Sequence, residues 1–153
     1  MVASLVSPLV EPFKNITGLS IPDYMPFWLD PSIYPMKTDP EILSPGYPLK
    51  GNYIFIVVMA VTLLLNILAE EFYFRAWLLP KMHSLGKWSW IVNGVLFAAY
   101  HTFQLWLFPI LLVASLTVAY VTYKSKSLWP AFIVHLVGNF VLAIIPIIIL
   151  VCG

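Results

Sequence analysis

Four long apolar stretches follow one another in the second part of the chain, at about residues 52–79, 88–105, 107–123 and 129–151. Each is close to the roughly 17–25 residues that a helix needs to cross the hydrocarbon core of a bilayer. Their apolar residues run continuously instead of alternating with polar ones, a pattern that does not fit transmembrane strands. The pattern therefore predicts an all-α integral membrane protein, a bundle of about four transmembrane helices.

Prolines mark the predicted ends of these helices. Pro80 is expected to end the first helix, because a proline removes a backbone donor and clashes with the preceding turn. Pro109 and Pro130 fall in the first turn of the third and fourth helices, where a missing N–H costs little. Pro146 lies inside the last stretch, so we expect a kink there.

Residues 1–50 differ from the rest of the chain and hold nine of its thirteen prolines. Prolines at this density predict an irregular arm instead of a long helix. The arm also carries aromatic residues, which favour the membrane–water interface; they are Tyr24, Phe27, Trp28, Tyr34 and Tyr47. We therefore predict two parts, an irregular interfacial segment at 1–50 and a transmembrane helical domain at 51–153. A flexible tail is the alternative interpretation of the first part.

The composition agrees with a membrane protein. Hydrophobic residues make up 61% and charged residues 10% of the chain, whereas about a quarter of residues are charged in a soluble domain. The formal net charge of +1 provides no basic field for nucleic acid, so no nucleic-acid partner is expected. The single cysteine, Cys152, excludes an internal disulfide framework.

Five ionisable side chains nevertheless lie inside the apolar stretches: Glu70, Glu71, Arg75, His101 and His135. A charge at the bilayer centre costs about 2.5–3.5 kcal/mol on insertion scales, so each group needs a partner or a task. A structural interpretation pairs Glu71 with Arg75, four residues later on the same helix face, and lets the histidines form interhelical hydrogen bonds. It does not account for Glu70, which points about 100° away around the helix.

The histidines have helical spacings of their own. "FAAYH" places Phe97 and His101 on one helix face, and "HLVGN" places His135 and Asn139 on another. Together with Glu70, these side chains supply a carboxylate, two imidazoles and an amide at membrane depth. Such a set is typical of a hydrolytic site that activates a water molecule.

Three motifs resemble those of the CPBP or Abi family. "EEFYFR" at 70–75 is similar to EExxxR, "FAAYH" at 97–101 to FxxxH, and "SLWPAFIVHLVGN" at 127–139 to HxxxN. The family contains type II CAAX prenyl endopeptidases and membrane proteins of bacteriocin processing or immunity. The resemblance covers about residues 52–145. Ala76 stands where relatives often have glycine, and relatives usually carry further helices before the first motif.

The resemblance implies an intramembrane endopeptidase. Glu70 would be the general base that activates water, and His101 would hold that water. His135 and Asn139 would bind the developing oxyanion, a task in which one donor contributes roughly 2.7–4 kcal/mol. The substrate would be a peptide or lipidated protein in the bilayer, for example a prenylated CAAX-type sequence.

The remaining motif residues receive supporting roles by the same resemblance. Glu71 and Arg75 would fix the first helix, and Phe97 would support the site. The chain has neither a G-x-S-x-G nor an HExxH motif, and a metal-independent mechanism is favoured. Zinc remains an alternative, with the ligand set Glu70, His101 and His135.

Two functions without catalysis compete with the protease. A membrane scaffold or bacteriocin-immunity protein would keep the fold and use its helices to bind a partner. A proton or ion pathway would also explain intramembrane Glu and His, but it gives no reason for Asn139 one turn after His135. The sequence does not predict an oligomeric state.

Lysines predict the orientation of the chain. The loops at 80–87 and 124–128 carry two lysines each, whereas the turn near 104–108 between them has no charge. The positive-inside rule therefore places both loops in the cytoplasm and both termini on the other side of a multi-pass protein.

Overall fold

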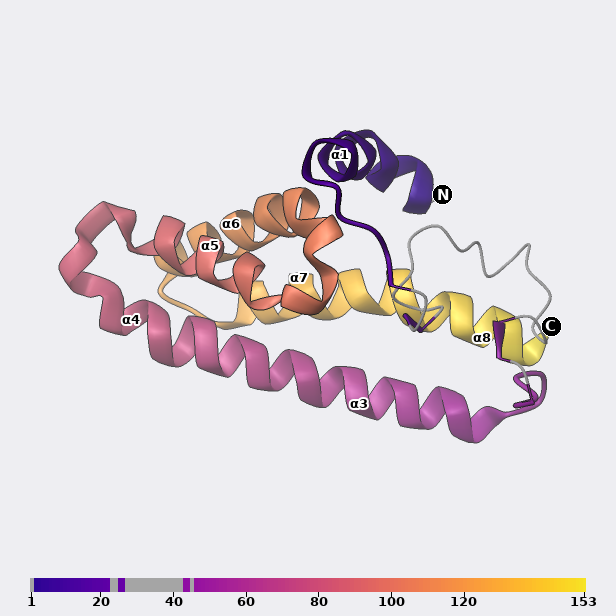
Figure 1. The fold of residues 1–153 in the computed structure, drawn as a ribbon. Helices are drawn as coiled ribbons and strands as arrows, with labels where there is room; N and C mark the ends of the chain where they lie inside the picture. The colour runs from indigo at the N-terminus through magenta and orange to yellow at the C-terminus, as the bar shows by residue number, and fades with distance from the viewer. Residues whose placement is uncertain (1, 23–24, 27–42, 45) are drawn as a thin grey trace.

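The computed structural model describes residues 2–22, 25–26, 43–44 and 46–153, and every regular element in these ranges is helical (Figure 1). The predicted all-α class is therefore confirmed. In chain order the elements are α1 (Val2–Thr17), α3 (Tyr53–Glu71), the π-helix η2 (Phe72–Leu78), α4 (Leu79–Lys81), the 3₁₀-helix η3 (Met82–Trp88), α5 (Ser89–Tyr100), the 3₁₀-helix η4 (Thr102–Leu107), α6 (Phe108–Ser125), α7 (Trp129–Asn139), the π-helix η5 (Phe140–Ile144) and α8 (Ile145–Cys152).

Three helical runs are long and apolar enough to cross a membrane: Tyr53–Tyr100, Thr102–Ser125 and Trp129–Cys152. The first run reverses direction near Gly86, whose φ of 54° and ψ of −126° are not helical. The returning helix α5 has only 12 residues, which is about 18 Å of helix against a hydrocarbon core of about 30 Å. The three long apolar runs make the chain a membrane protein. Because α5 is short, the predicted count of four spanning helices is not confirmed.

Figure 1 shows α3, η2 and α4 as one long rod along one side of the molecule. The C-terminal run of α7, η5 and α8 lies beside this rod, and α5 and α6 form a shorter hairpin that packs against α7. The two helices of the hairpin, α5 and α6, approach each other closely at Gly94. A Cβ added there would lie 2.8 Å from Leu116 Cδ2 and 3.0 Å from Leu116 Cα. Ser115 Oγ donates a 2.8 Å hydrogen bond to the Gly94 carbonyl. A small residue is therefore required at this crossing.

Each π-helix ends two residues before a proline. Leu79 N–H bonds to Phe74 O at the end of η2 and precedes Pro80, while Ile145 N–H bonds to Phe140 O at the end of η5 and precedes Pro146. A proline cannot donate to the carbonyl four residues earlier and its ring crowds that carbonyl, and the wider i→i+5 turn accommodates this crowding. Pro80 consequently lies inside a helical run whose α4 segment continues to Lys81. The prediction that Pro80 ends the helix is therefore wrong, because this segment ends one residue later.

The N-terminal segment corrects another prediction. Residues 2–17 form α1 although Pro8 and Pro12 lie within it, so the expectation of an irregular arm is wrong for this part. Packing offsets the lost hydrogen bonds, because Val10 is buried and the Phe13 ring stacks on Phe108 at 6.3 Å. Of the interfacial aromatics expected here, Tyr47 is exposed; Tyr24, Phe27, Trp28 and Tyr34 lie outside the described residues.

Candidate active site

Helices α3, α5 and α7 bring the polar motif residues together within the apolar bundle. Glu70 and Glu71 end α3 directly before η2, and both are buried. His101 lies at the break between α5 and η4 and is also buried, whereas His135 lies on α7 and is half-buried. Glu70 and His135, which are 65 positions apart in the chain, thereby share one cluster.

The Glu70 carboxylate faces both histidines. Its Oε1 lies 3.9 Å from His101 Nε2, and its Oε2 lies 3.8 Å from His135 Nε2. These separations exceed the length of a direct hydrogen bond, but a water molecule that donates one hydrogen to each partner can bridge groups at this spacing. A water molecule placed beside the carboxylate and an imidazole, and not in line between them, can therefore contact both groups.

The orientation of His101 follows from where its helix ends. Its backbone leaves the helical region at ψ 50°, and its Nδ1 lies 2.9 Å from the carbonyl oxygen of Phe97, one turn earlier. A carbonyl oxygen only accepts, so Nδ1 carries the hydrogen in this contact. In the neutral ring, Nε2 then presents its lone pair toward Glu70.

Glu71 connects two partners. Its Oε2 lies 3.5 Å from Arg75 Nε, so the ion pair predicted from the i,i+4 spacing is present. Its Oε1 accepts a 2.8 Å hydrogen bond from His135 Nδ1, a contact that sequence reasoning missed. Glu71 therefore positions an imidazole of the site as well as an arginine of its own helix.

Phe97 is the aromatic centre of the cluster. The Arg75 guanidinium carbon lies 3.9 Å from its ring centroid, and the His101 and His135 rings lie 4.8 and 5.9 Å away. Arg75 Nε and Nη1 are buried without hydrogen-bond partners within the described part of the chain. The face of the Phe97 ring therefore helps to stabilise the buried positive charge of Arg75. These contacts fit a supporting role for Phe97.

Asn139 lies one turn after His135 on α7, but it does not reach the carboxylate. Its Nδ2 donates a 3.1 Å hydrogen bond to the backbone carbonyl of His135, and this is its one hydrogen bond among the described residues. The structure thus places Asn139 beside His135 without joining it to Glu70.

Asn93 is a further buried polar residue, and it lies outside the three motifs. It is fully buried on α5, and its Nδ2 donates a 2.8 Å hydrogen bond to Phe74 O. This carbonyl belongs to η2, the π-helix that separates Glu71 from α4. A lone amide inside the apolar stretch "WIVNGVLF" was the available signal, because an amide in a membrane helix needs an interhelical partner.

The alternative zinc ligands, Glu70, His101 and His135, are not arranged as a metal site in this structure. Zinc bonds of about 2.0–2.2 Å place ligand atoms about 3.4 Å apart in a tetrahedron. The separations from Glu70 to the two imidazoles are wider. Among the described residues, no group of three or more His, Cys, Asp or Glu side chains could hold a metal ion.

Comparison with known proteins agrees with the motifs. A family model described as "Type II CAAX prenyl endopeptidase Rce1-like" matches residues 52–141, which is more than half of the 153-residue chain. The matched range includes all the motif residues from Glu70 to Asn139. Neither the curated proteins nor the solved structures produced a match.

Proposed function

This chain belongs to the Rce1-like family of type II CAAX prenyl endopeptidases, and on that premise we propose that it hydrolyses a peptide bond in a membrane-associated substrate. A prenylated CAAX-type peptide is the favoured substrate class. The observation that carries the proposal is the buried Glu70 carboxylate with an imidazole Nε2 opposite each of its oxygens. Membership of the family confirms the resemblance to CPBP proteins that the three motifs indicated.

In the proposed reaction, Glu70 is the general base. A water molecule donates one hydrogen to the carboxylate and the other to the Nε2 lone pair of His101, so its oxygen lone pair is free to attack the peptide carbonyl. As the new C–O bond forms, Glu70 takes the first proton and the carbonyl becomes an oxyanion. Collapse breaks the C–N bond, and Glu70 returns the proton to the leaving amine.

His135 is proposed to stabilise the oxyanion. Because its Nδ1 donates to Glu71, the ring can donate to an oxyanion only from a protonated Nε2, that is, as an imidazolium held by Glu71. Asn139 would add a second donor if its amide rotates away from the His135 carbonyl. One such donor contributes roughly 2.7–4 kcal/mol to transition-state stabilisation.

The depth of the cluster fits a substrate that is held in the bilayer. Glu70 precedes Lys81, an exposed lysine at the end of the long rod, by 11 residues, or roughly 16 Å of helix. A peptide that carries a lipid anchor can approach this depth from within the membrane, whereas an unanchored polar peptide must cross headgroups and hydrocarbon. We infer that the lipid chain delivers the scissile bond to the site.

A cleavage assay tests the function. The full chain is reconstituted in lipid vesicles with a peptide that ends in a prenylated cysteine and three further residues, and mass spectrometry follows the fragments. We expect cleavage of this peptide and none of the same peptide without its prenyl group. Intact prenylated peptide under conditions in which the protein is folded would contradict the protease and leave a membrane scaffold as the better interpretation.

The proposed mechanism also predicts that activity does not require a metal. We expect chelator treatment to leave the cleavage rate unchanged and elemental analysis to find far less than one zinc per chain, because Glu70 and His101 alone activate the water. Stoichiometric zinc, together with chelator-sensitive activity that zinc restores, would replace this mechanism by one that uses Glu70, His101 and His135 as ligands.

The predicted orientation is open to a labelling test. Cysteines at Ser84 and Ser125, both exposed, are introduced into a Cys152→Ser background and treated on intact cells with an impermeant thiol reagent. We expect labelling only after permeabilisation, because both lysine-bearing loops face the cytoplasm. The unmodified chain, whose Cys152 is exposed at the other end, is the control and should be labelled without permeabilisation. The reverse pattern would show an inverted topology.

A further inference from the structure

Four exposed lysines lie at one end of the bundle. Two of them flank the turn between α4 and α5, and two lie at the end of α6; we call Lys81, Lys87, Lys124 and Lys126 the lysine rim. The two turns occupy the same end in Figure 1, and the Trp90 and Tyr120 rings join their helices at 5.1 Å. No acidic residue follows Glu71 in the sequence, so the charge of the rim is not compensated by nearby carboxylates of its own segments.

Each ammonium group of the lysine rim lies over an aromatic ring. The distances from Nζ to the ring centroid are 3.6 Å for Lys81 over Trp77, 4.3 Å for Lys126 over Tyr123, 5.7 Å for Lys87 over Trp88 and 5.8 Å for Lys124 over Tyr120. These are the geometries of cation–π contacts. The rings therefore hold the charges in place at the end of the bundle.

The rim keeps donors available for an external acceptor. Within the described part of the chain, none of its four lysines forms an ion pair or a hydrogen bond, and an ammonium group has three donors. Tryptophan and tyrosine favour the boundary between hydrocarbon and headgroups. Lysines that lie over such rings are therefore expected to present N–H groups at the level of the lipid phosphates.

We propose that the lysine rim binds the phosphate groups of anionic lipid headgroups. Charge complementarity carries the assignment, since four positive charges lie on two adjacent turns without an acid, and lysine binds phosphate as a point charge. Lys14, in contrast to the lysines of the rim, forms an ion pair, because Glu11 lies 3.2 Å from its Nζ. Bound headgroups would fix the height of the bundle, and with it the depth of Glu70 in the bilayer. The proposal does not depend on catalysis.

Lipid selectivity tests the rim. The full chain is reconstituted in phosphatidylcholine vesicles that contain a trace of spin-labelled phosphatidylglycerol or spin-labelled phosphatidylcholine, and electron paramagnetic resonance measures the immobilised fraction of each. We expect a preference for phosphatidylglycerol that falls as salt is added, because salt screens exposed charges. The double variant Lys81→Gln/Lys126→Gln should weaken this preference by up to about fivefold per lysine, the equivalent of roughly 1 kcal/mol for a basic residue near an anionic surface.

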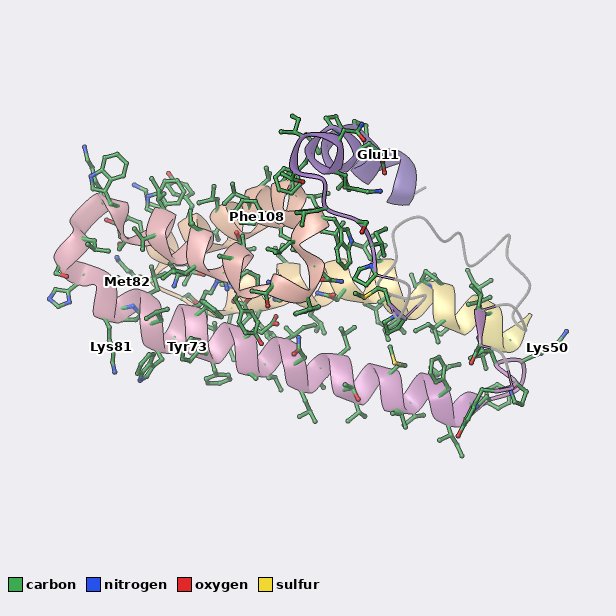
Figure 2. The ribbon with its side chains drawn as sticks, viewed as in Figure 1. Glu11, Lys50, Tyr73, Lys81, Met82 and Phe108 are labelled. Carbon is green, nitrogen blue, oxygen red and sulfur yellow. The ribbon has the colours of Figure 1, made fainter. Side chains whose placement is uncertain are left out.

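A matched control removes two charges elsewhere. Figure 2 shows Lys50 and Lys81 at opposite ends of the molecule, so the double variant Lys14→Gln/Lys50→Gln should keep the preference of the unmodified chain. Lys81→Arg/Lys126→Arg should keep it too, which separates a loss of charge from a loss of fold. The proposal is overturned if the unmodified chain shows no preference, if the rim glutamine variant retains it, or if the control variant loses as much.

Discussion

Replacing Glu70 by glutamine should abolish peptide cleavage while the protein remains folded. The amide has the shape of the carboxylate but cannot take a proton from water, and loss of a general base typically costs 10²–10⁴-fold in rate. Stability should change little, because the separations of 3.8 and 3.9 Å show that Glu70 makes no direct hydrogen bond to either histidine. The cleavage rate and the thermal unfolding temperature of the purified protein are measured together.

Glu11→Gln is the matched control for Glu70→Gln. Glu11 is an exposed acid on α1 that pairs with Lys14, away from the cluster, so its replacement should leave the cleavage rate unchanged. Retained cleavage in Glu70→Gln would refute the proposed general base. A large drop in its unfolding temperature would instead show that Glu70 serves the fold.

Local spacing predicts the contacts that lie within one helix. Glu71 and Arg75 are four residues apart, so helical geometry alone brings them together, and their ion pair is present in the structure. The same rule correctly placed Phe97 beside His101, whose ring bonds to the Phe97 carbonyl. Contacts of this kind depend only on the α-helical repeat, which a continuous apolar stretch predicts well.

Contacts between helices need information that spacing does not contain. His135 bonds to Glu71 and not directly to Glu70, a choice set by how α7 packs against α3. The amide of Asn139 could point into the site or back to its own helix, and in the structure it bonds to the His135 carbonyl. Local spacing is compatible with either outcome, because it does not determine the rotation of one helix relative to another.

The same limit explains the errors in the fold. A count of prolines predicted an irregular N-terminal arm, but packing of Val10 and Phe13 stabilises α1 despite Pro8 and Pro12. Hydropathy also predicted a long second helix, because residues 88–105 form one largely apolar stretch. The backbone break at His101 shortens that helix and gives its imidazole access to Glu70, which an average over apolar residues cannot detect.

The neighbouring carboxylates of Glu70 and Glu71 have different partners in this cluster, which fits the separate roles proposed for them. Glu71 is fully buried and contacts both Arg75 and His135, so it has partners that compensate its charge. Glu70 faces two imidazoles at 3.9 and 3.8 Å, which is too far for direct hydrogen bonds. Variants of Glu71 and of Arg75 should therefore affect folding, whereas variants of Glu70 should not.

Replacing Arg75 by alanine should destabilise the protein and reduce cleavage at the same time. The change leaves Glu71 in an apolar environment with His135 as its remaining partner, and it removes the guanidinium from the Phe97 ring. Breaking a buried ion pair by removing one partner typically costs about 3–5 kcal/mol. Thermal unfolding in detergent measures the loss of stability. The cleavage rate per folded molecule measures the separate loss of activity that a displaced His135 would cause.

The double variant Glu71→Gln/Arg75→Ala separates this account from a simple loss of packing. If the buried ion pair is responsible, removing both charges should destabilise the protein by less than the sum of the single changes, because neither member of the Glu71–Arg75 pair is then left charged without the other. Arg75→Lys is the matched variant, and it should fall between the unmodified chain and Arg75→Ala, since it keeps the charge but loses the planar contact with Phe97. An unfolding temperature for Arg75→Ala equal to that of the unmodified chain would contradict the prediction and show that Glu71 does not require its arginine.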